Sequence, residues 1–298
     1  MRQIARGWRR AGPPAPFVVG VGRSGTTLLR LMLDAHPELA IPAETQFVPD
    51  LIAAAGHGAD ADELCELIVG ARNWSDFALP EAALRERLAT LGSPGAPEVL
   101  RAFYGLYAER QGKPRWGDKT PGYVRDMRAI AKALPEARFI HLIRDGRDVA
   151  LSRRRRGMGS GKPLAETAAL WRRRIEGARR QARRLRGRYL EIRYEALVTD
   201  PEPELRRACE LCELEPDPAM LGFHEGAAAR LAEMSGDLAP EDGRIARTGE
   251  ERLAAHALAT RPPTDLRTGA WRTEMNEAER AELEAVAGKL LRELGYDA

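Results

Sequence analysis

The stretch FVVGVGRSGTTLLRLMLDAH, residues 17–36, constrains the fold more than any other part of the chain. An apolar run of strand length leads into a glycine-rich turn, and a helical pattern follows the turn. Gly20 and Gly25 satisfy the spacing G-x-x-x-x-G, and Thr27 fits the final Ser/Thr position of a phosphate-binding loop. Backbone N–H groups at the start of such a helix are unpaired and favour an anion. Thr26, however, stands where ATP- and GTP-using loops carry a lysine.

Two further apolar runs predict buried strands, FIHLI at 139–143 and YLEIRY at 189–194. Strands that alternate with helices indicate parallel strands joined by crossovers. The expected fold class is therefore α/β, with a P-loop NTPase-like central parallel sheet flanked by helices. Besides the helix at 26–35, periodic patterns predict helices at 123–134, 164–186, 202–213 and 276–294, the last capped by Asn276.

A chain of 298 residues with 44% hydrophobic content can bury one large core, and we expect a single domain over 1–298. Residues 1–16 are basic and proline-rich and are interpreted as a flexible arm. Residues 50–110 look mainly helical and are expected to cap the carboxyl edge of the sheet. No apolar run reaches 18 residues, so no membrane span is expected, and we expect a cytoplasmic protein.

The three cysteines are Cys65, Cys209 and Cys212. The last two form a CxxC, but no second pair of ligands accompanies it, so core cysteines are expected and a metal site is not. Of the 47 basic residues only five are lysines. The abundance of arginine is most simply a bias of coding composition, which weakens the argument that any single arginine is functional.

A second candidate anion site follows the FIHLI strand, in LIRDGRDVALSRRRR. Arg144 stands at the end of the strand, and Ser152 lies two helical turns later. A guanidinium with a nearby hydroxyl suits a phosphate. The alternative is a surface ion network in which Arg144 pairs with Asp145 or Asp148.

Together, these blocks resemble the sulfotransferases that use 3'-phosphoadenylyl sulfate (PAPS), and they are most similar to the tyrosylprotein and carbohydrate branch. The resemblance covers roughly 17–49, 115–160 and 185–215, and it suggests a bacterial member. It implies PAPS as the donor, adenosine 3',5'-bisphosphate (PAP) as the product, and no metal. The residues implied for the 5'-phosphosulfate end are Arg23, Ser24, Gly25, Thr26 and Thr27. Those implied for the 3'-phosphate and adenosine end are Arg144, Ser152, Arg156, Tyr194 and, more weakly, Arg261, which stands ten residues before Trp271.

Sulfuryl transfer to a hydroxyl needs a group that removes the acceptor proton and a charge that stabilises the transition state. The resemblance implies Glu44 as the base, because it stands 21 residues after Arg23, and Lys119 as the cation beside the sulfonate, with Arg23 assisting. Asp118 is expected to orient Lys119. The alternatives are a surface glutamate that caps the next helix and an exposed lysine in a turn. His36 competes as the base, although its place at a helix end favours a packing role.

The acceptor is expected to be a small molecule, carbohydrate or lipid hydroxyl. The tyrosylprotein enzymes carry arginines two and six residues after the catalytic glutamate, where this chain has Gln46 and Asp50. The main alternative function is a P-loop kinase or NTPase with a degenerate loop, and a non-catalytic nucleotide-binding regulator is a third. Nucleic-acid binding is not expected, because no recognisable module is present. The oligomeric state stays open, with a homodimer as one alternative. The glycine-rich segment 157–163 is interpreted either as a lid or as a plain connector.

Overall fold

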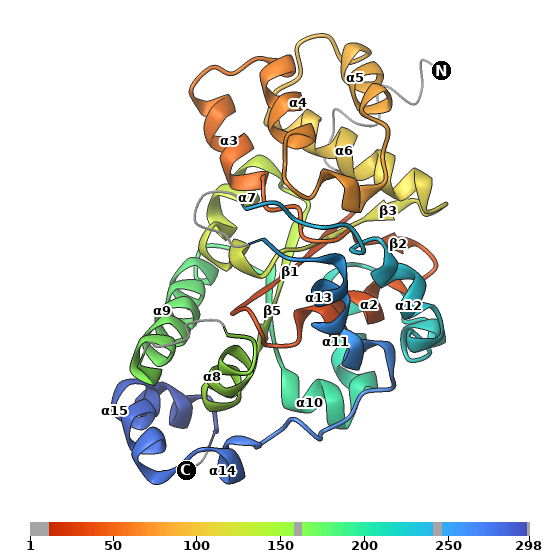
Figure 1. Cartoon of the computed structure of the whole chain (residues 1–298). Helices are drawn as coiled ribbons and strands as arrows, with labels where there is room; N and C mark the ends of the chain where they lie inside the picture. The colour runs from red at the N-terminus through yellow and green to blue at the C-terminus, as the bar shows by residue number, and fades with distance from the viewer. Residues whose placement is uncertain (1–11, 158–162, 241–245, 297–298) are drawn as a thin grey trace.

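A parallel four-stranded sheet forms the centre of the protein (Figure 1). The computed structural model describes residues 12–157, 163–240 and 246–296. The strand order is β4-β1-β5-β6, and all three pairings are parallel. The strands are β1 (Ala15–Gly20), β4 (Asp118–Lys119), β5 (Ala137–Ile143) and β6 (Tyr189–Arg193). The predicted fold class is confirmed.

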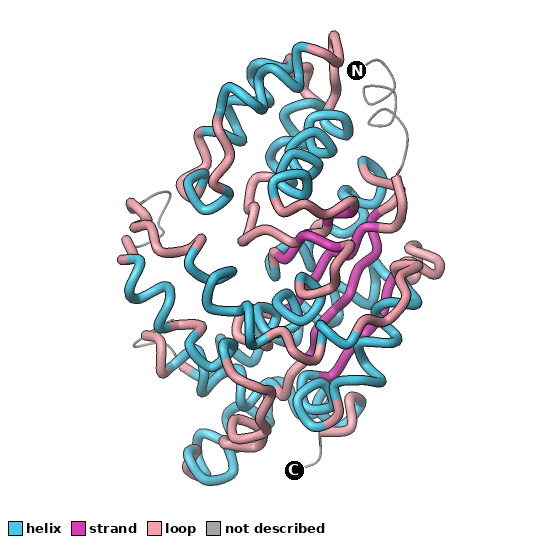
Figure 2. The backbone as a smooth tube through the Cα atoms, turned by 90° about the vertical axis from the view of Figure 1, so that its right-hand side faces the viewer, coloured by secondary structure: helices cyan, strands magenta, loops and turns pink. Residues whose placement is uncertain are grey.

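Helices cover both faces of this sheet (Figures 1 and 2). On one side lie α2 (Thr26–Asp34), α10 (Tyr194–Thr199) and α11 (Pro201–Leu211). On the other side lie α7 (Met127–Ala133), α8 (Gly146–Arg154) and α9 (Leu164–Ala182), with α15 (Glu277–Glu293) packed on α8 and α9. β1 is entirely buried, as is expected of a central parallel strand. The predicted cap of α15 is confirmed, because the side chain of Asn276 accepts from the N–H of Glu279.

The helix expected over 123–134 is interrupted. A 3₁₀ helix, η2 (Pro121–Arg125), precedes α7, and Asp126 leaves the helical conformation between them. The Tyr123 hydroxyl lies 2.7 Å from Thr45 Oγ1 and accepts from the N–H of Val48. These hydrogen bonds hold η2 against residues 45–48, so tertiary contacts override the local helical pattern.

A helical lobe follows α2, as predicted for 50–110 (Figure 1, orange to yellow). It contains α3 (Val48–Gly56), α4 (Ala61–Val69), η1 (Trp74–Phe77), α5 (Glu81–Ala89) and α6 (Ala96–Arg110). Its aromatic core continues into the sheet, where Tyr104 stacks on Trp116 at 4.5 Å between ring centroids. Trp116 belongs to β3 (Arg115–Trp116), which pairs with β2 (Leu39–Ala40). The smaller remaining elements are η3 (Pro218–Met220), α12 (His224–Ala232), α13 (Gly249–Ala254), η4 (Ala257–Thr260) and α14 (Trp271–Glu274).

The amino-terminal arm ends earlier than expected. Residues 14–16 are already buried, β1 begins at Ala15, and the Pro14 carbonyl accepts a hydrogen bond of 2.7 Å from Arg115. Residues 1–11 of the predicted arm lie outside the described part of the chain. All three cysteines are unpaired and buried, as predicted. Within the described ranges, no helix combines the length and the apolar character needed to cross a bilayer.

Candidate functional site

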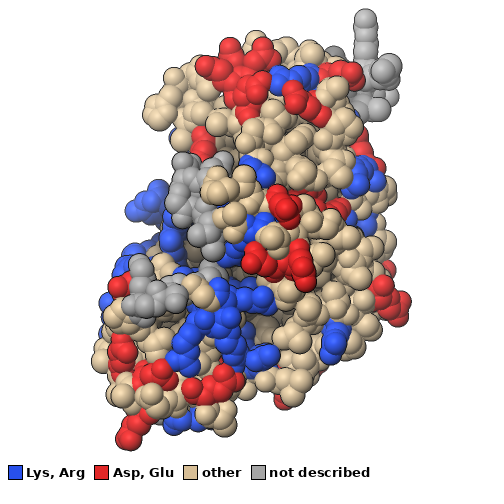
Figure 3. Space-filling model, viewed as in Figure 1, with Lys and Arg blue, Asp and Glu red and all other residues tan. Residues whose placement is uncertain are grey.

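The carboxyl ends of the sheet strands surround one cavity of about 690 Å³. β1 leads into the glycine-rich loop, β5 into Arg144, and β6 into Tyr194. Eight arginines line the cavity, but Glu44 is the one carboxylate among its lining residues in the described part of the chain. Lysine and arginine side chains gather around a hollow on the same face of the protein (Figure 3). This excess of positive charge suits a polyanionic ligand.

The glycine-rich loop takes a left-handed conformation at two positions, with φ of 81° at Arg23 and 95° at Gly25. A Cβ on Gly25 would lie 2.6 Å from Cε2 of Tyr194, so the loop requires glycine there for two reasons. Thr26 and Thr27 form the first turn of α2, where the N–H groups have no partner within the helix. Both threonines line the cavity, as predicted.

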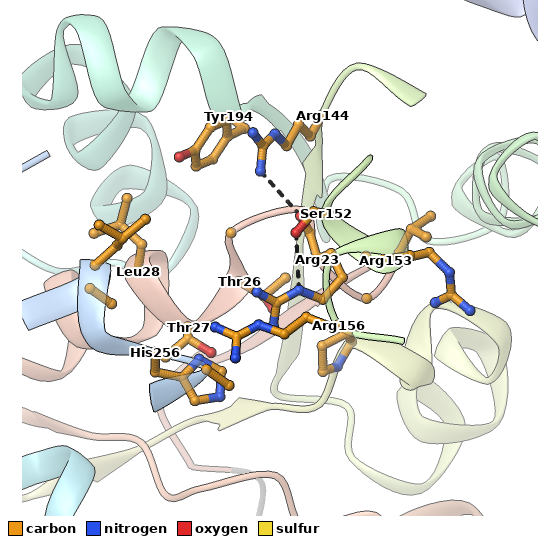
Figure 4. A pocket seen from close by; sticks show the side chains of 18 of the residues that line it. Arg23, Thr26, Thr27, Leu28, Arg144, Ser152, Arg153, Arg156, Tyr194 and His256 are labelled. Carbon is orange, nitrogen blue, oxygen red and sulfur yellow. Dashed lines mark hydrogen bonds between the residues drawn. The ribbon is translucent and has the colours of Figure 1, made fainter. Parts of the chain in front are cut away.

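Arg23 projects into the cavity, where its Nε donates to Ser152 Oγ at 3.2 Å (Figure 4). Burial lowers the pKa of Arg23, and the charges of Arg156 and Arg144 lower it further. The electrostatic repulsion among these guanidinium groups is relieved when an anion binds beside them. Ser24 is not brought to the cavity: its side chain is buried below the loop, and its N–H donates to the Val21 carbonyl at 3.1 Å.

Backbone and side-chain contacts hold Arg144 in place beside the cavity. Its guanidinium donates to the carbonyls of Arg23 and Arg267 and stacks 4.3 Å from the ring centroid of Tyr194. Its own carbonyl accepts from Trp171 Nε1 at 3.0 Å. These contacts, made by residues around the cavity and by the buried Trp171 behind it, fix the direction in which Arg144 points.

The alternative surface ion network around Arg144 is wrong. Asp145 is engaged by Arg147 at 2.9 Å. Asp148 instead accepts from the backbone N–H groups of Gly269 and Trp271, at 2.7 and 3.1 Å. The neighbouring carboxylates are therefore occupied elsewhere, and Arg144 remains directed toward the cavity.

The carboxyl-terminal part of the chain completes the cavity. Arg156 lies at its wall and donates to the Ala254 carbonyl at 2.9 Å. Arg261 does not line the cavity, contrary to the prediction, because it follows η4 on the exposed side of that turn. Arg247, His256 and Arg267 line it instead, and all three were missed from the sequence.

Glu44 and Lys119 meet at the edge of the cavity. Lys119 Nζ lies 2.8 Å from Glu44 Oε1. The Lys119 side chain is 1% exposed, whereas that of Glu44 is 35% exposed and reaches the cavity. The predicted pair is thus brought together, with the carboxylate accessible and the ammonium behind it. Neither alternative, a capping surface glutamate or an exposed turn lysine, describes this geometry.

A buried hydrogen-bond network fixes the segments that carry this pair. Thr45 Oγ1 donates to Asp118 Oδ2 at 2.8 Å, and the Thr45 N–H donates to Thr120 Oγ1 at 3.1 Å. Tyr104 also donates to Asp118, at 2.9 Å. Asp118 therefore positions Thr45, and through Thr45 it positions Glu44. The sequence instead predicted that Asp118 orients Lys119 directly.

The two histidines His36 and His256 have different surroundings. His36 Nδ1 accepts from the Glu38 N–H at 3.1 Å, and its Nε2 lies 2.8 Å from the carbonyl of the distant Glu215, so it has a packing role and does not line the cavity. His256 faces the cavity beside Thr27 and Arg156 (Figure 4). Burial lowers the pKa of His256 well below its usual range, and the charges of Lys119 and Arg23 lower it further. His256 is therefore a neutral imidazole at neutral pH.

Two further predictions concern the segment 157–163 and the helical lobe 50–110. Residues 158–162 of the predicted lid lie outside the described residues. No residue of 50–110 is among those that line the cavity in the described part of the chain, so this lobe does not cap the site. It supports the site from behind, since Asn73 Nδ2 donates to the Glu44 carbonyl at 2.6 Å. No cluster of three metal-ligating side chains occurs among the described residues.

Comparison with known proteins gives a consistent result. A model of the sulfotransferase family matches residues 14–218. Protein-tyrosine sulfotransferase 1 of Danio rerio is 28% identical over 218 residues, which are 71% of this chain and 56% of that protein. The putative protein-tyrosine sulfotransferase of Caenorhabditis briggsae is 28% identical over 72% of this chain and 71% of that protein. The chain thus spans about half the length of the Danio rerio relative.

Two solved structures share the fold. The sulfotransferase domain from the curacin biosynthetic pathway superimposes with a TM-score of 0.65 at 20% identity, over 97% of this chain and 99% of that domain. The sulfotransferase domain of the Synechococcus PCC 7002 olefin synthase gives a TM-score of 0.59 at 23% identity, over 97% of each chain. The family match extends over more than half of the residues and includes the loop, Glu44, Lys119 and Arg144, so this chain belongs to the sulfotransferase family.

Proposed function

We propose that this protein transfers a sulfuryl group from PAPS to a hydroxyl of a small-molecule, carbohydrate or lipid acceptor. The observation that carries the proposal is the Glu44–Lys119 ion pair of 2.8 Å at the edge of a cavity lined by eight arginines. The cavity suits a donor with several negative charges, and the ion pair places the Glu44 carboxylate at its wall with the Lys119 ammonium directly behind it.

The donor would be bound at its two phosphate ends. The N–H groups of Thr26 and Thr27, with Arg23, suit the 5'-phosphosulfate, because the amino end of a helix favours an anion. Arg144 and Ser152 suit the 3'-phosphate, with Arg156 beside them. The Tyr194 ring, stacked on Arg144, offers an adjacent apolar surface for the adenosine. Arg267 adds a further charge on this side.

The reaction needs one proton transfer and one displacement. Glu44 removes the proton of the acceptor hydroxyl, and the hydroxyl oxygen then forms a bond to the sulfur of the donor. The bond between sulfur and the phosphate oxygen breaks, and PAP leaves with that electron pair. Lys119, already beside Glu44, supplies positive charge for the sulfonate and the leaving oxygen. This general base would contribute roughly 10²–10⁴-fold to the rate.

Replacement of Glu44 by glutamine tests this assignment. We expect turnover with PAPS to fall by roughly 10²–10⁴-fold while the affinity for PAP, measured by calorimetry, stays unchanged. Glu38→Gln is the matched control, because Glu38 is exposed on the same connection after α2 and does not line the cavity. Unchanged turnover of the Glu44 variant would remove this residue as the base. Tight ATP binding without a preference for PAP would favour a kinase or NTPase instead.

A further inference from the structure

A side branch of the cavity opens between η2 and α9. This second hollow has a volume of about 340 Å³, and Val124, Leu170 and Arg174 line both it and the main cavity. Arg125 and Arg173 complete its basic wall. The branch therefore continues from the side of the cavity on which Glu44 lies, and it is separate from the strand-end residues assigned to the donor.

The arginines of this branch are not explained by ion pairs. Within the described ranges, neither Arg173 nor Arg174 forms an ion pair or a side-chain hydrogen bond. On the same helix, in contrast, Arg172 donates to the Val286 carbonyl at 2.8 Å, and Arg179 binds Glu191 at 2.7 Å. Arg180, exposed on the same helix, is likewise without an ion pair among the described residues, so what distinguishes Arg173 and Arg174 is their position around one hollow.

The electrostatic balance of the branch favours an anion. Burial lowers the pKa of Arg174, and the nearby charges of Arg125 and Arg173 lower it further, with Asp126 opposing them. Three guanidinium groups around one hollow repel each other unless an anion lies between them. Guanidinium groups bind carboxylate, phosphate and sulfate through forked hydrogen bonds.

We propose that this branch binds an anionic group of the acceptor, so that the substrate is a hydroxylated small molecule which also carries a carboxylate, phosphate or sulfate. This inference rests on the proposed function. η2 runs from Pro121, which lines the main cavity, to Val124 and Arg125, which line the branch. The acceptor therefore carries its anionic group at the end remote from the hydroxyl that is sulfated.

The first test compares matched acceptors. ω-Hydroxydecanoate and its methyl ester share the reacting hydroxyl and differ in the charge at the other end. We expect kcat/KM of the wild-type protein to favour the acid by roughly tenfold, as for a charge-assisted contact. The double variant Arg125→Ala, Arg173→Ala, at two residues that line the branch and not the main cavity, should lose this preference through a higher KM for the acid, with the ester unaffected. Arg180→Ala is the control, because Arg180 lies on α9 but does not line the hollow.

A second measurement does not depend on turnover. Decanoate is titrated by calorimetry into the PAP-saturated wild-type protein and the double variant. We expect binding to the wild type and at least tenfold weaker binding to the double variant, with PAP affinity equal in both. Equal decanoate binding, or equal kcat/KM for the acid and the ester, would overturn the inference. Failure of the proposed function gives a different result, namely no PAP binding and no transfer to either acceptor.

Discussion

Replacing Asp118 by asparagine isolates the cost of ionising a carboxyl group in the protein interior. Asp118 is fully buried, and burial raises its pKa from 3.8 to about 6, although hydrogen bonds from Thr45 and Tyr104 act in the opposite direction. The shift of about two units corresponds to about 3 kcal/mol. Because the pKa of Asp118 is raised in the folded state, its protonated form contributes this free energy to stability below pH 4. The contribution is lost as the pH rises through 6.

Asparagine cannot ionise, yet it keeps an oxygen for Thr45 and Tyr104. We therefore expect the stability of Asp118→Asn, relative to wild type, to increase with pH, by about 1.5 kcal/mol between pH 5 and pH 8. Urea unfolding at both pH values measures this difference. Asp62→Asn, at an exposed position of α4, is the control. A relative stability that does not change with pH would refute the claim that Asp118 is ionised at a cost.

Three further predictions follow from individual contacts. Gly25→Ala should lower stability by about 1–3 kcal/mol and weaken PAP binding, because alanine disfavours φ of 95° and its Cβ meets Tyr194; thermal melting and calorimetry check both. The PAP affinity of the wild type relative to His256→Gln should rise as the pH falls from 7.5 to 5.5 in calorimetry, because a bound anion opposes the burial and positive charges that lower the pKa of His256, whereas the phosphates of PAP titrate equally with both proteins. Arg252→Ala should cost about 3–5 kcal/mol in urea unfolding, because it leaves Asp76 buried without its main partner.

Each of these has a control or a contrary outcome. Gly226→Ala, where a Cβ meets nothing within 4 Å and φ is not positive, should not destabilise the protein. Arg85→Ala breaks only exposed ion pairs and should cost less than about 1 kcal/mol. A ratio of wild-type to His256→Gln affinity that does not change with pH would assign the proton to another group.

The parts of the site predicted from the sequence are those with a strong local signal. The loop before α2 combines strand periodicity, glycine spacing and a helix start, and Arg144 follows a continuous apolar strand. The pairing of Glu44 with Lys119 was different, because they lie 75 residues apart and only the family resemblance related them.

The parts that were missed lack such signals. His256 and Arg267 lie on short turns after α13, where no periodic pattern indicates which side chains face inward. Arg261 was chosen by its spacing to Trp271, but spacing along a coil does not determine direction. Similarly, the interruption at Asp126 depends on hydrogen bonds of Tyr123 to a distant segment, which no local pattern reveals.

The contacts of Asp148 have a consequence for the order in which the protein becomes competent during synthesis. This carboxylate on α8 holds the N–H groups of Gly269 and Trp271, and so determines where Arg267 lies. All four strands of the sheet precede residue 194, so a growing chain can form the sheet and the glycine-rich loop early. It cannot close the wall of the cavity until Trp271 has left the ribosome. A nascent chain can therefore form its central sheet well before it completes the cavity at the strand ends.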